Sequence, residues 1–347
     1  MNIRNATTVV LLAALATTAC AATPPPAQKA AVTVIDNGRI DRWDPAMDAI
    51  VPKDWKIEKL AEGFGWAEGP IWVKSGGYLL FTDVPGNRMW KWSERGGLEK
   101  FLDPSGAASF DPEIWREAGA NGLAIYDENS ILVADTGNRN IQRLDLGTKK
   151  KTPVASAFEG KKFSSPNDVV KTRAGVLFFT DPPYGFRKFD DAPEKEISFN
   201  GVYRMGKDGQ VTAIEKELTR PNGVALSPDE SVLYVAQSEG KKAIVNAYAL
   251  DKDGNVTGKK LFQDLTDLAS KDAPGAPDGL TVAADGTVFV TGPGGIIVLS
   301  KDGKRLGRIW DGKQTANCKF GDDGRTLYMT SHNMLARIRL DIKGAGF

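Results

Sequence analysis

The sequence predicts an all-β protein, a six-bladed β-propeller. Short β-rich runs recur six times along residues 55–347. The repeats are about 45–50 residues long, which is the length of a propeller blade. The last repeat stops after its third strand, while an extra strand precedes the first repeat. These three observations together indicate a ring of blades that the extra strand closes.

Each repeat is built around a run rich in β-branched and aromatic residues, which favours a strand. A tight turn with Gly or polar residues precedes each run, and another alternating strand follows it. The six runs are YLLFTD (78–83), ILVAD (131–135), VLFFTD (176–181), VLYVAQ (232–237), VFVTG (288–292) and TLYMTS (326–331).

The ends of the repeat region predict how the ring closes. The final repeat ends with LARIRL at 335–340, and the extra strand is WKIEKLA at 55–61. We expect these two segments to share a blade, because closure in this way removes exposed sheet edges. The propeller domain is therefore predicted to span residues 55–347.

Residues 1–21 are predicted to be an export signal. The first 28 residues carry one charge, and the apolar stretch 9–16 has the length of a signal-peptide core but is too short to span a bilayer. Cys20 resembles the lipid-accepting cysteine of bacterial lipoproteins, and ordinary cleavage near Ala21 is the alternative. Residues 22–54 are expected to be a Pro/Ala-rich tether and lead-in. The mature protein is thus expected in the periplasm or tethered to an envelope membrane.

One oxygen-bearing residue opens the inner strand of every repeat, in the contexts WAEGP, GANGL, SPNDV, RPNGV, APDGL and TANCK. Taken singly, Asn-Gly and Asp-Gly are ordinary turn dipeptides. The inner strands of a propeller line its channel, so the six side chains would converge on one axis. Two carboxylates and several amide oxygens suit one hard cation: Ca²⁺ fits best, Mg²⁺ and Mn²⁺ are suitable, and Zn²⁺ is less favoured. In chain order the six residues are Glu68, Asn121, Asn167, Asn222, Asp278 and Asn317.

The long connections are predicted to gather at one mouth of the channel. If inner strands start at this mouth, the connections 103–120, 181–200 and 264–277 return to it, whereas the turns at the opposite face are short. Long loops on one face of a rigid scaffold are where binding and catalysis usually occur. Segment 181–200 is the candidate lid, with an ordinary surface loop as the alternative.

At these motifs the chain resembles the SMP-30/gluconolactonase/LRE-like family. The resemblance implies a six-bladed propeller with one catalytic divalent cation in the channel, often calcium in bacterial members, and hydrolysis of sugar lactones such as glucono-1,5-lactone. Relatives hydrolyse other esters or organophosphates, so the fold alone does not select the substrate. The ordered motifs are WAEGP, SSPNDVV, LFFTDPPYG, NGVYRM, RPNGVALSPD, APDGL, GRIWDG and ANCKFG followed by TLYMTS.

Carried over to this chain, the family's metal ligands correspond to Glu68, Asn167, Asn222 and Asp278. In some members the residue at the Asn167 position faces the substrate, which makes Asn167 a candidate for substrate binding too. Vertebrate members carry an arginine two residues before this asparagine to hold the sugar. Ser165 stands there in this chain, so the vertebrate substrate preference does not carry over.

Four further residues are candidates for substrate contacts. Asn121 and Asn317 match the family's remaining channel positions, where substrate or water contacts are expected. Asp181 ends the third run and Tyr184 follows it at the mouth, and both could hydrogen-bond a sugar. A turn aspartate and a packed aromatic ring are the alternatives for these two.

The predicted reaction is hydrolysis of a lactone whose carbonyl is polarised by the cation. Asp278 is the candidate general base for the attacking water, although a carboxylate that also binds a metal is a weakened base. Metal-bound hydroxide is the alternative. Two other functions remain open: an arylesterase or phosphotriesterase-type hydrolase, and a non-catalytic calcium-stabilised ligand-binding propeller.

Composition excludes other classes of site and partner. The 45 Lys+Arg and 44 Asp+Glu give no electrostatic reason to expect nucleic acid. The single histidine, His332, excludes zinc sites built on several histidines, and two cysteines cannot make a disulfide framework. Cys318 is expected in blade packing, His332 on the mouth side in a surface position, and tryptophans such as Trp72 and Trp92 between blades. We expect a small-molecule lactone or ester as the partner, no transmembrane helix, and a monomer.

Overall fold

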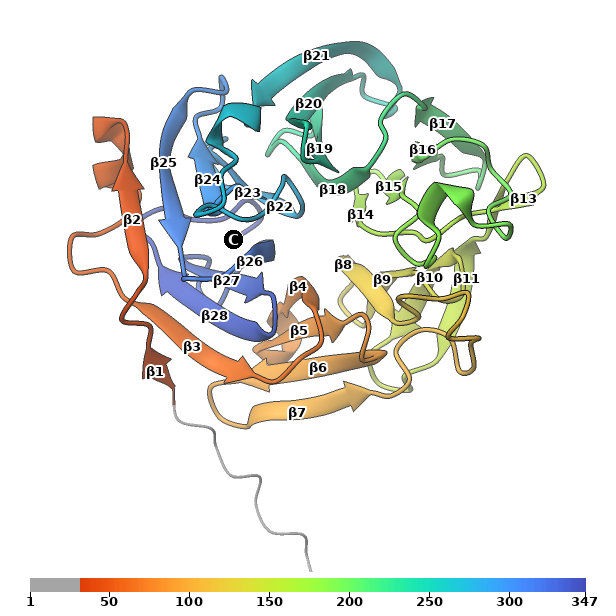
Figure 1. Ribbon diagram of the computed structural model, residues 1–347, viewed down its shortest axis with the longest axis horizontal. Coiled ribbons are helices and arrows are strands. Elements are labelled where there is room, and N and C mark those ends of the chain that lie inside the picture. The colour runs from red at the N-terminus through yellow and green to blue at the C-terminus, as the bar shows by residue number, and fades with distance from the viewer. Residues whose placement is uncertain (1–31) are drawn as a thin grey trace, which may run out of the picture.

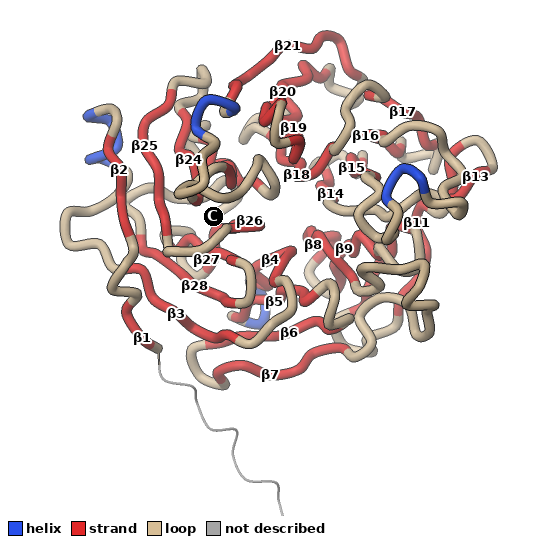
Figure 2. Tube along the Cα trace, in the orientation of Figure 1, coloured by secondary structure: helices blue, strands red, loops and turns tan. Residues whose placement is uncertain are grey.

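The computed structural model describes residues 32–347, which form a ring of six antiparallel β-sheets around a central channel (Figure 1). Successive blades follow one another around the ring in chain order, so the predicted six-bladed propeller is confirmed. Strands make up almost all of the regular structure (Figure 2). The predicted signal and Cys20 lie outside the described residues. Within residues 32–347, no helix combines the length and apolar character needed to cross a membrane.

In each blade the innermost strand is followed outward by the next strands of the chain, except that the fourth strand of blade 6 comes from the segment before blade 1. Blade 1 contains β4 (Ala67–Val73), β5 (Tyr78–Asp83), β6 (Arg88–Ser93) and β7 (Gly97–Leu102). Blade 2 contains β8 (Ala120–Asp127), β9 (Ser130–Asp135), β10 (Asn140–Asp145) and β11 (Lys151–Ala155). Blade 3 contains β14 (Val169–Lys171), β15 (Leu177–Asp181), β16 (Gly201–Met205) and β17 (Val211–Glu215).

The second half of the ring repeats this order. Blade 4 contains β18 (Pro221–Leu226), β19 (Val232–Glu239), β20 (Lys242–Leu250) and β21 (Val256–Asp264). Blade 5 contains β22 (Leu280–Val282), β23 (Val288–Gly292), β24 (Gly295–Leu299) and β25 (Arg305–Trp310). Blade 6 contains β26 (Thr315–Gly321), β27 (Thr326–Ser331), β28 (Met334–Arg339) and β3 (Ile57–Glu62).

Outside the blades lie a small hairpin and four short 3₁₀ turns. They are β12 (Ala157–Phe158), β13 (Lys161–Lys162), η1 (Pro45–Ala49), η2 (Lys74–Gly76), η3 (Phe189–Asp191) and η4 (Thr266–Leu268).

The N-terminal strand β3 closes the ring, as predicted. It pairs antiparallel with β28, and Ile57 lies opposite Ile338. The lead-in before it also joins the fold, which the sequence did not predict. Strand β1 (Thr33–Val34) pairs with the outer edge of β3, and β2 (Arg39–Arg42) pairs with β25 of blade 5. The expected tether and lead-in 22–54 therefore supplies two edge strands from residue 33 onward.

The apolar core lies between the blades, which leaves the channel free for polar groups. Where blade 6 meets blade 1, Trp72 stacks on Tyr328 with ring centroids 5.7 Å apart, and Trp92 packs beside them. Cys318 is buried in the cluster between blades 5 and 6, and burial raises the pKa of its thiol to about 12. The predicted packing roles of Trp72, Trp92 and Cys318 are confirmed.

Candidate active site

The pairing of the inner strands is irregular where their polar residues stand. The register against the second strand shifts after Glu68 in β4, and across Asn121 in β8 and Asn222 in β18. A bulge of this kind turns a side chain away from the regular alternation of the strand. These shifts explain how residues within continuous strands reach the channel.

The glycine that follows the polar residue allows neighbouring inner strands to approach each other. Gly122 N donates to Asn167 O at 2.7 Å, and Gly223 N donates to Asp278 O at 3.1 Å. A Cβ at Gly223 would lie 2.2 Å from this oxygen, so a larger residue would push the blades apart. Asn-Gly in β8 and β18 is therefore a contact between blades rather than a turn dipeptide.

A cavity of about 510 Å³ opens at this end of the channel. Its lining contains five of the six predicted channel residues, together with Tyr184 from the loop after β15. The remaining lining comes from the loops around the mouth and from the ends of neighbouring strands. The predicted residues in the lining are Glu68, Asn121, Asn167, Tyr184, Asn222 and Asp278. The others are Gly65, Trp66, Pro85, Arg116, Glu117, Ser238, Ala276 and Gln314.

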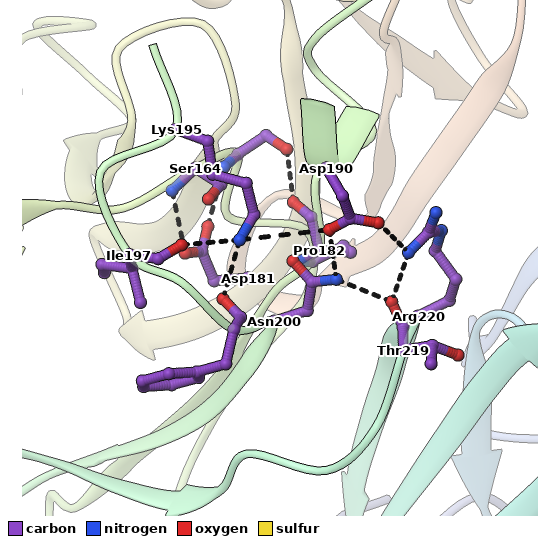
Figure 3. Close-up of polar contacts among 11 residues, drawn as sticks. Ser164, Asp181, Pro182, Asp190, Lys195, Ile197, Asn200, Thr219 and Arg220 are labelled. Carbon is purple, nitrogen blue, oxygen red and sulfur yellow. Dashed lines mark hydrogen bonds and ion pairs between the residues drawn. The ribbon is translucent and has the colours of Figure 1, made fainter. Parts of the chain in front are cut away.

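Two predicted substrate contacts, Asn317 and Asp181, do not line the cavity. Asn317 is buried behind Glu68 and donates its Nδ2 to Glu68 Oε2 at 3.1 Å. Asp181 is completely buried, and its carboxylate accepts the backbone N–H groups of Ser164 at 2.8 Å and Ser165 at 2.7 Å (Figure 3). Asn317 orients a carboxylate, and Asp181 holds the chain that enters blade 3, as in the turn-aspartate alternative. A substrate contact by either residue stays a prediction.

Burial and like charge act on the carboxylates at the floor of the cavity. Burial raises the pKa of Glu68 to about 7, against the hydrogen bonds from Asn317 and from Gly69 N at 3.1 Å. Burial, followed by the negative charge of Glu68, raises the pKa of Asp278 well above its ordinary value. Two carboxylates that repel each other in a buried site favour either a proton or a cation between them.

Two buried oxygen atoms at this floor lack a hydrogen-bond donor within the described residues. Within residues 32–347, neither Asp278 Oδ1 nor Asn121 Oδ1 has a donor, although both atoms are buried. Asn222 donates its Nδ2 to Ser238 Oγ at 2.8 Å, which commits the nitrogen of this amide and leaves its carbonyl oxygen. Buried oxygens without donors cost free energy unless a ligand or water satisfies them.

This donor set fits one hard cation. In the described part of the chain, no three His, Cys, Asp or Glu side chains gather closely enough to hold a metal by themselves. The two carboxylates of Glu68 and Asp278 need amide oxygens to complete the shell, and Asn167 and Asn222 line the same cavity. Carboxylate and amide oxygens are the ligands that Ca²⁺ prefers.

Two mouth loops build the wall above the floor. Residues 103–119 and 182–200 pack against each other through Trp115 and Phe186, whose ring centroids lie 5.0 Å apart. Arg116 N and Glu117 N both donate to Gly185 O, at 2.8 and 3.3 Å. The length of both loops could be predicted from the sequence, but the roles of Arg116 and Glu117 could not, because no repeated motif marks them.

The candidate lid, residues 181–200, is a wall fastened at several points. At its start, Ser165 Oγ donates to Pro182 O at 2.5 Å and accepts Gly185 N at 2.9 Å. Further along, Asp190 accepts hydrogen bonds from Asn200 at 2.8 Å and Arg220 at 2.6 Å (Figure 3).

Two more residues complete this region. Lys195 Nζ is nearly buried in the 182–200 loop and donates to Ile197 O at 2.6 Å.

His332 is exposed, as predicted, and its ring lies edge-to-face against Trp66 of the cavity at 5.6 Å. This contact places the single histidine on the mouth side.

Comparisons with known proteins agree with this architecture. The family model "SMP-30/Gluconolactonase/LRE-like region" matches residues 66–333. The chain is 40% identical over 306 residues to a gluconolactonase of Zymomonas mobilis, covering 87% of this chain and 86% of that protein. A solved gluconolactonase from Xanthomonas campestris has a TM-score of 0.76 at 28% identity, covering 90% of this chain and 98% of that one. A calcium-binding regucalcin from Agrobacterium tumefaciens shares the fold, with a TM-score of 0.63 at 19% identity over 83% of this chain and 94% of that one.

Proposed function

The chain belongs to the SMP-30/gluconolactonase/LRE-like family, and we propose that it hydrolyses a sugar lactone with the help of one divalent cation. The observation that carries this proposal is the convergence of Glu68 and Asp278 with two amide side chains in one open cavity. Similarity to gluconolactonases of two other organisms supports a lactone as the substrate.

Glu68, Asn167, Asn222 and Asp278 would hold the cation. Bound there, the cation would supply a Lewis acid that polarises the lactone carbonyl and stabilises charge developing on its oxygen. The all-oxygen donor set favours Ca²⁺, and one relative of the same fold is a calcium-binding protein. Mg²⁺, Mn²⁺ and Zn²⁺ are the competitors that a binding experiment must include.

The chain's own residues would orient the substrate and take up a proton. Asp278 is the proposed general base, because its carboxylate lines the cavity and its Oδ1 is buried without a donor within residues 32–347. Asn121 and Tyr184 line the cavity around it and offer an amide and a phenol to the substrate. Asn317 keeps Glu68 oriented from behind.

The test is lactone hydrolysis followed by pH-stat titration. Glucono-1,5-lactone, other aldonolactones and aryl esters are offered to the purified protein before and after chelation, with each metal added back. We expect turnover of an aldonolactone that is lost on chelation and restored by Ca²⁺. Absence of ester or lactone turnover by metal-loaded protein would refute the hydrolase, and a preference for aryl esters would select the arylesterase alternative.

A substitution separates the site from general effects on the fold. Asp278→Asn should lower lactone turnover by at least about a hundredfold, the range typical of losing a general base. Asp311→Asn is the matched control. Asp311 is also buried, and burial raises its pKa, but its carboxylate accepts a hydrogen bond from Ser331 Oγ and lies outside the cavity lining. Full activity of Asp278→Asn would remove Asp278 from its proposed role.

We also propose that the protein is exported and acts as a monomer. The apolar N-terminal stretch and Cys20 support export with lipidation at Cys20, or with cleavage near Ala21. Mass spectrometry of the mature N-terminus from a membrane fraction distinguishes the two, because lipidation adds the mass of acyl chains. Light scattering measures the molar mass of the purified mature chain and so tests whether it is a monomer.

A further inference from the structure

Arg116 and Glu117 sit in the lining of the cavity, next to the proposed cation site. The negative charge of Glu117 is one of the causes that raise the pKa of Asp278, which places the two carboxylates within electrostatic reach of each other. Neither residue belongs to the motifs that mark the family resemblance. Because both side chains line the cavity, they are candidates for contact with the substrate.

The fold holds this pair in place through a chain of contacts. Gly185 O accepts the backbone amides of both residues, and Gly185 N is itself bonded to Ser165 Oγ. The site around Gly185 is tight: a Cβ there would lie 2.7 Å from Ser165 Cβ and 3.0 Å from the Trp115 ring. Ser165 thus organises the loop that fixes Arg116 and Glu117 at the cavity wall.

The pair presents hydrogen-bond donors and acceptors side by side. An Arg116 Nη group donates to the Glu117 carboxylate, and within the described residues the Arg116 side chain makes no other hydrogen bond. A guanidinium has five N–H donors, so most of them remain available. The guanidinium also packs over the Phe189 and Tyr184 rings, 5.2 and 5.8 Å from their centroids, which limits its orientation. Glu117 is largely buried, so its acceptor oxygens face little competing water.

The charges of the lining favour a neutral substrate over an anionic one. The described lining contains three carboxylates, those of Glu68, Glu117 and Asp278, and one guanidinium. A divalent cation would bring the formal charge of these four lining groups to zero. A carboxylate or phosphate on the substrate would then meet no net positive potential, whereas a neutral molecule with many hydroxyls would find matched donors and acceptors.

We propose that Arg116 and Glu117 form a polyol-binding subsite, in which guanidinium and carboxylate together bind adjacent hydroxyls of a neutral lactone. The inference rests on the proposed lactonase function and deepens it, because it names two residues that bind the hydroxyls of the sugar lactone. Arg116 supplies a guanidinium to the cavity from the loop between blades 1 and 2.

The experiment compares two lactones of the same ring size. Glucono-1,5-lactone carries hydroxyls, and δ-valerolactone carries none. We measure kcat and KM for both with wild-type protein, Arg116→Met and Glu117→Gln, each loaded with Ca²⁺. The ratio of kcat/KM for the sugar lactone over δ-valerolactone should fall at least tenfold in both variants, mainly through KM. A binding readout accompanies it: calorimetric affinity for 1,5-anhydroglucitol, a cyclic polyol without a carbonyl, should fall by a similar factor.

Arg143→Met is the matched control. Arg143 has nearly the same side-chain exposure as Arg116, 44% against 43%, and also pairs with a carboxylate and packs over a tyrosine ring. It lies on β10, outside the cavity lining. The control should leave the ratio within twofold of the wild-type value.

Each outcome decides one of the two proposals. If wild-type protein hydrolyses neither lactone, the proposed function fails and the subsite with it. If wild-type protein hydrolyses both lactones but the ratio and the polyol affinity do not change in Arg116→Met and Glu117→Gln, the subsite alone is refuted. A faster reaction of wild-type protein with the anionic glucaro-1,4-lactone than with the neutral lactone would also overturn the substrate class.

Discussion

Glu68→Gln is expected to stabilise the chelated protein and to abolish its stabilisation by the cation. In the folded state, burial raises the pKa of Glu68 from 4.5 to about 7. At about 1.4 kcal/mol per pH unit, this shift corresponds to about 3 kcal/mol of folding free energy that wild-type protein loses when the carboxylate is ionised. Glutamine keeps the size and an acceptor oxygen for Gly69 and Asn317 but carries no charge.

The sign of the pH dependence follows from linkage. Because the folded state binds the Glu68 proton more tightly than the unfolded chain does, wild-type stability falls as pH rises from about 4.5 to about 7. Glutamine does not titrate. The advantage of Glu68→Gln in urea unfolding of chelated protein should therefore be below about 1 kcal/mol at pH 5 and approach about 3 kcal/mol at pH 8.

Adding the cation should reverse the order of stability. A ligand at a thousand times its Kd stabilises the folded state by about 4.1 kcal/mol, which exceeds the deficit of about 3 kcal/mol at pH 8, and the variant should gain little of this. Glu215→Gln is the control with opposite sign, because bonds from Lys259 and Tyr248 outweigh burial and lower the pKa of Glu215. It should destabilise the protein at pH 8. A Glu68→Gln advantage that is equal at pH 5 and pH 8 would refute the reasoning.

Three further predictions follow. Leu60 in β3 is 2% exposed, so Leu60→Ala should lower the free energy of unfolding in urea by about 2–5 kcal/mol. The exposed control Leu261→Ala should lower it by less than about 0.5 kcal/mol. Equal effects would contradict ring closure by β3. Gly69→Ala would place a Cβ 2.2 Å from Asn121 O, at a backbone φ of +52°. Because this would displace the strand that carries Glu68, the Ca²⁺ affinity measured by calorimetry should fall at least tenfold. An unchanged affinity would show that the inner strands adjust freely. Because Glu68 must lose its proton to bind metal, Ca²⁺ affinity should fall about tenfold per pH unit below about pH 7; calorimetry at pH 5.5 and 7.5 measures it, and a flat profile would argue against Glu68 as a ligand.

The fold could be predicted from the sequence because its signals repeat. Six similar runs and one surplus strand define both the number of blades and the closure by β3. The two edge strands β1 and β2 give no comparable signal, since they are short and rich in charge, as in RIDR at 39–42. The partner of β2 is β25, contributed by the far end of the chain, and only the closed ring brings the two together.

The candidate site likewise contains residues that can be predicted from the sequence and residues that cannot. Glu68, Asn222 and Asp278 could be found because equivalent positions recur in every blade. Arg116 and Glu117 could not, because their place in the cavity depends on a contact with Gly185 in another loop. Loops that occur once carry no internal comparison, and their side chains are placed by tertiary packing rather than by period.

The position of a carboxylate at the channel mouth can be predicted from the sequence, but its role as a binding group or a structural group cannot, and Asp181 is an example. The second strands of blades 1 and 3 both end in aspartate, and these aspartates play equivalent parts: Asp83 accepts the amides of Gly65 and Trp66, as Asp181 accepts those of the two serines before blade 3. Burial raises the pKa of Asp181 to about 7, and it raises the pKa of Asp278 as well, so the direction of the pKa shift cannot distinguish them. The hydrogen bonds can, because Asp181 already has both oxygens satisfied by backbone amides, whereas within residues 32–347 Asp278 Oδ1 has no donor. A cation would gain a free ligand from Asp278 and would have to displace two hydrogen bonds at Asp181.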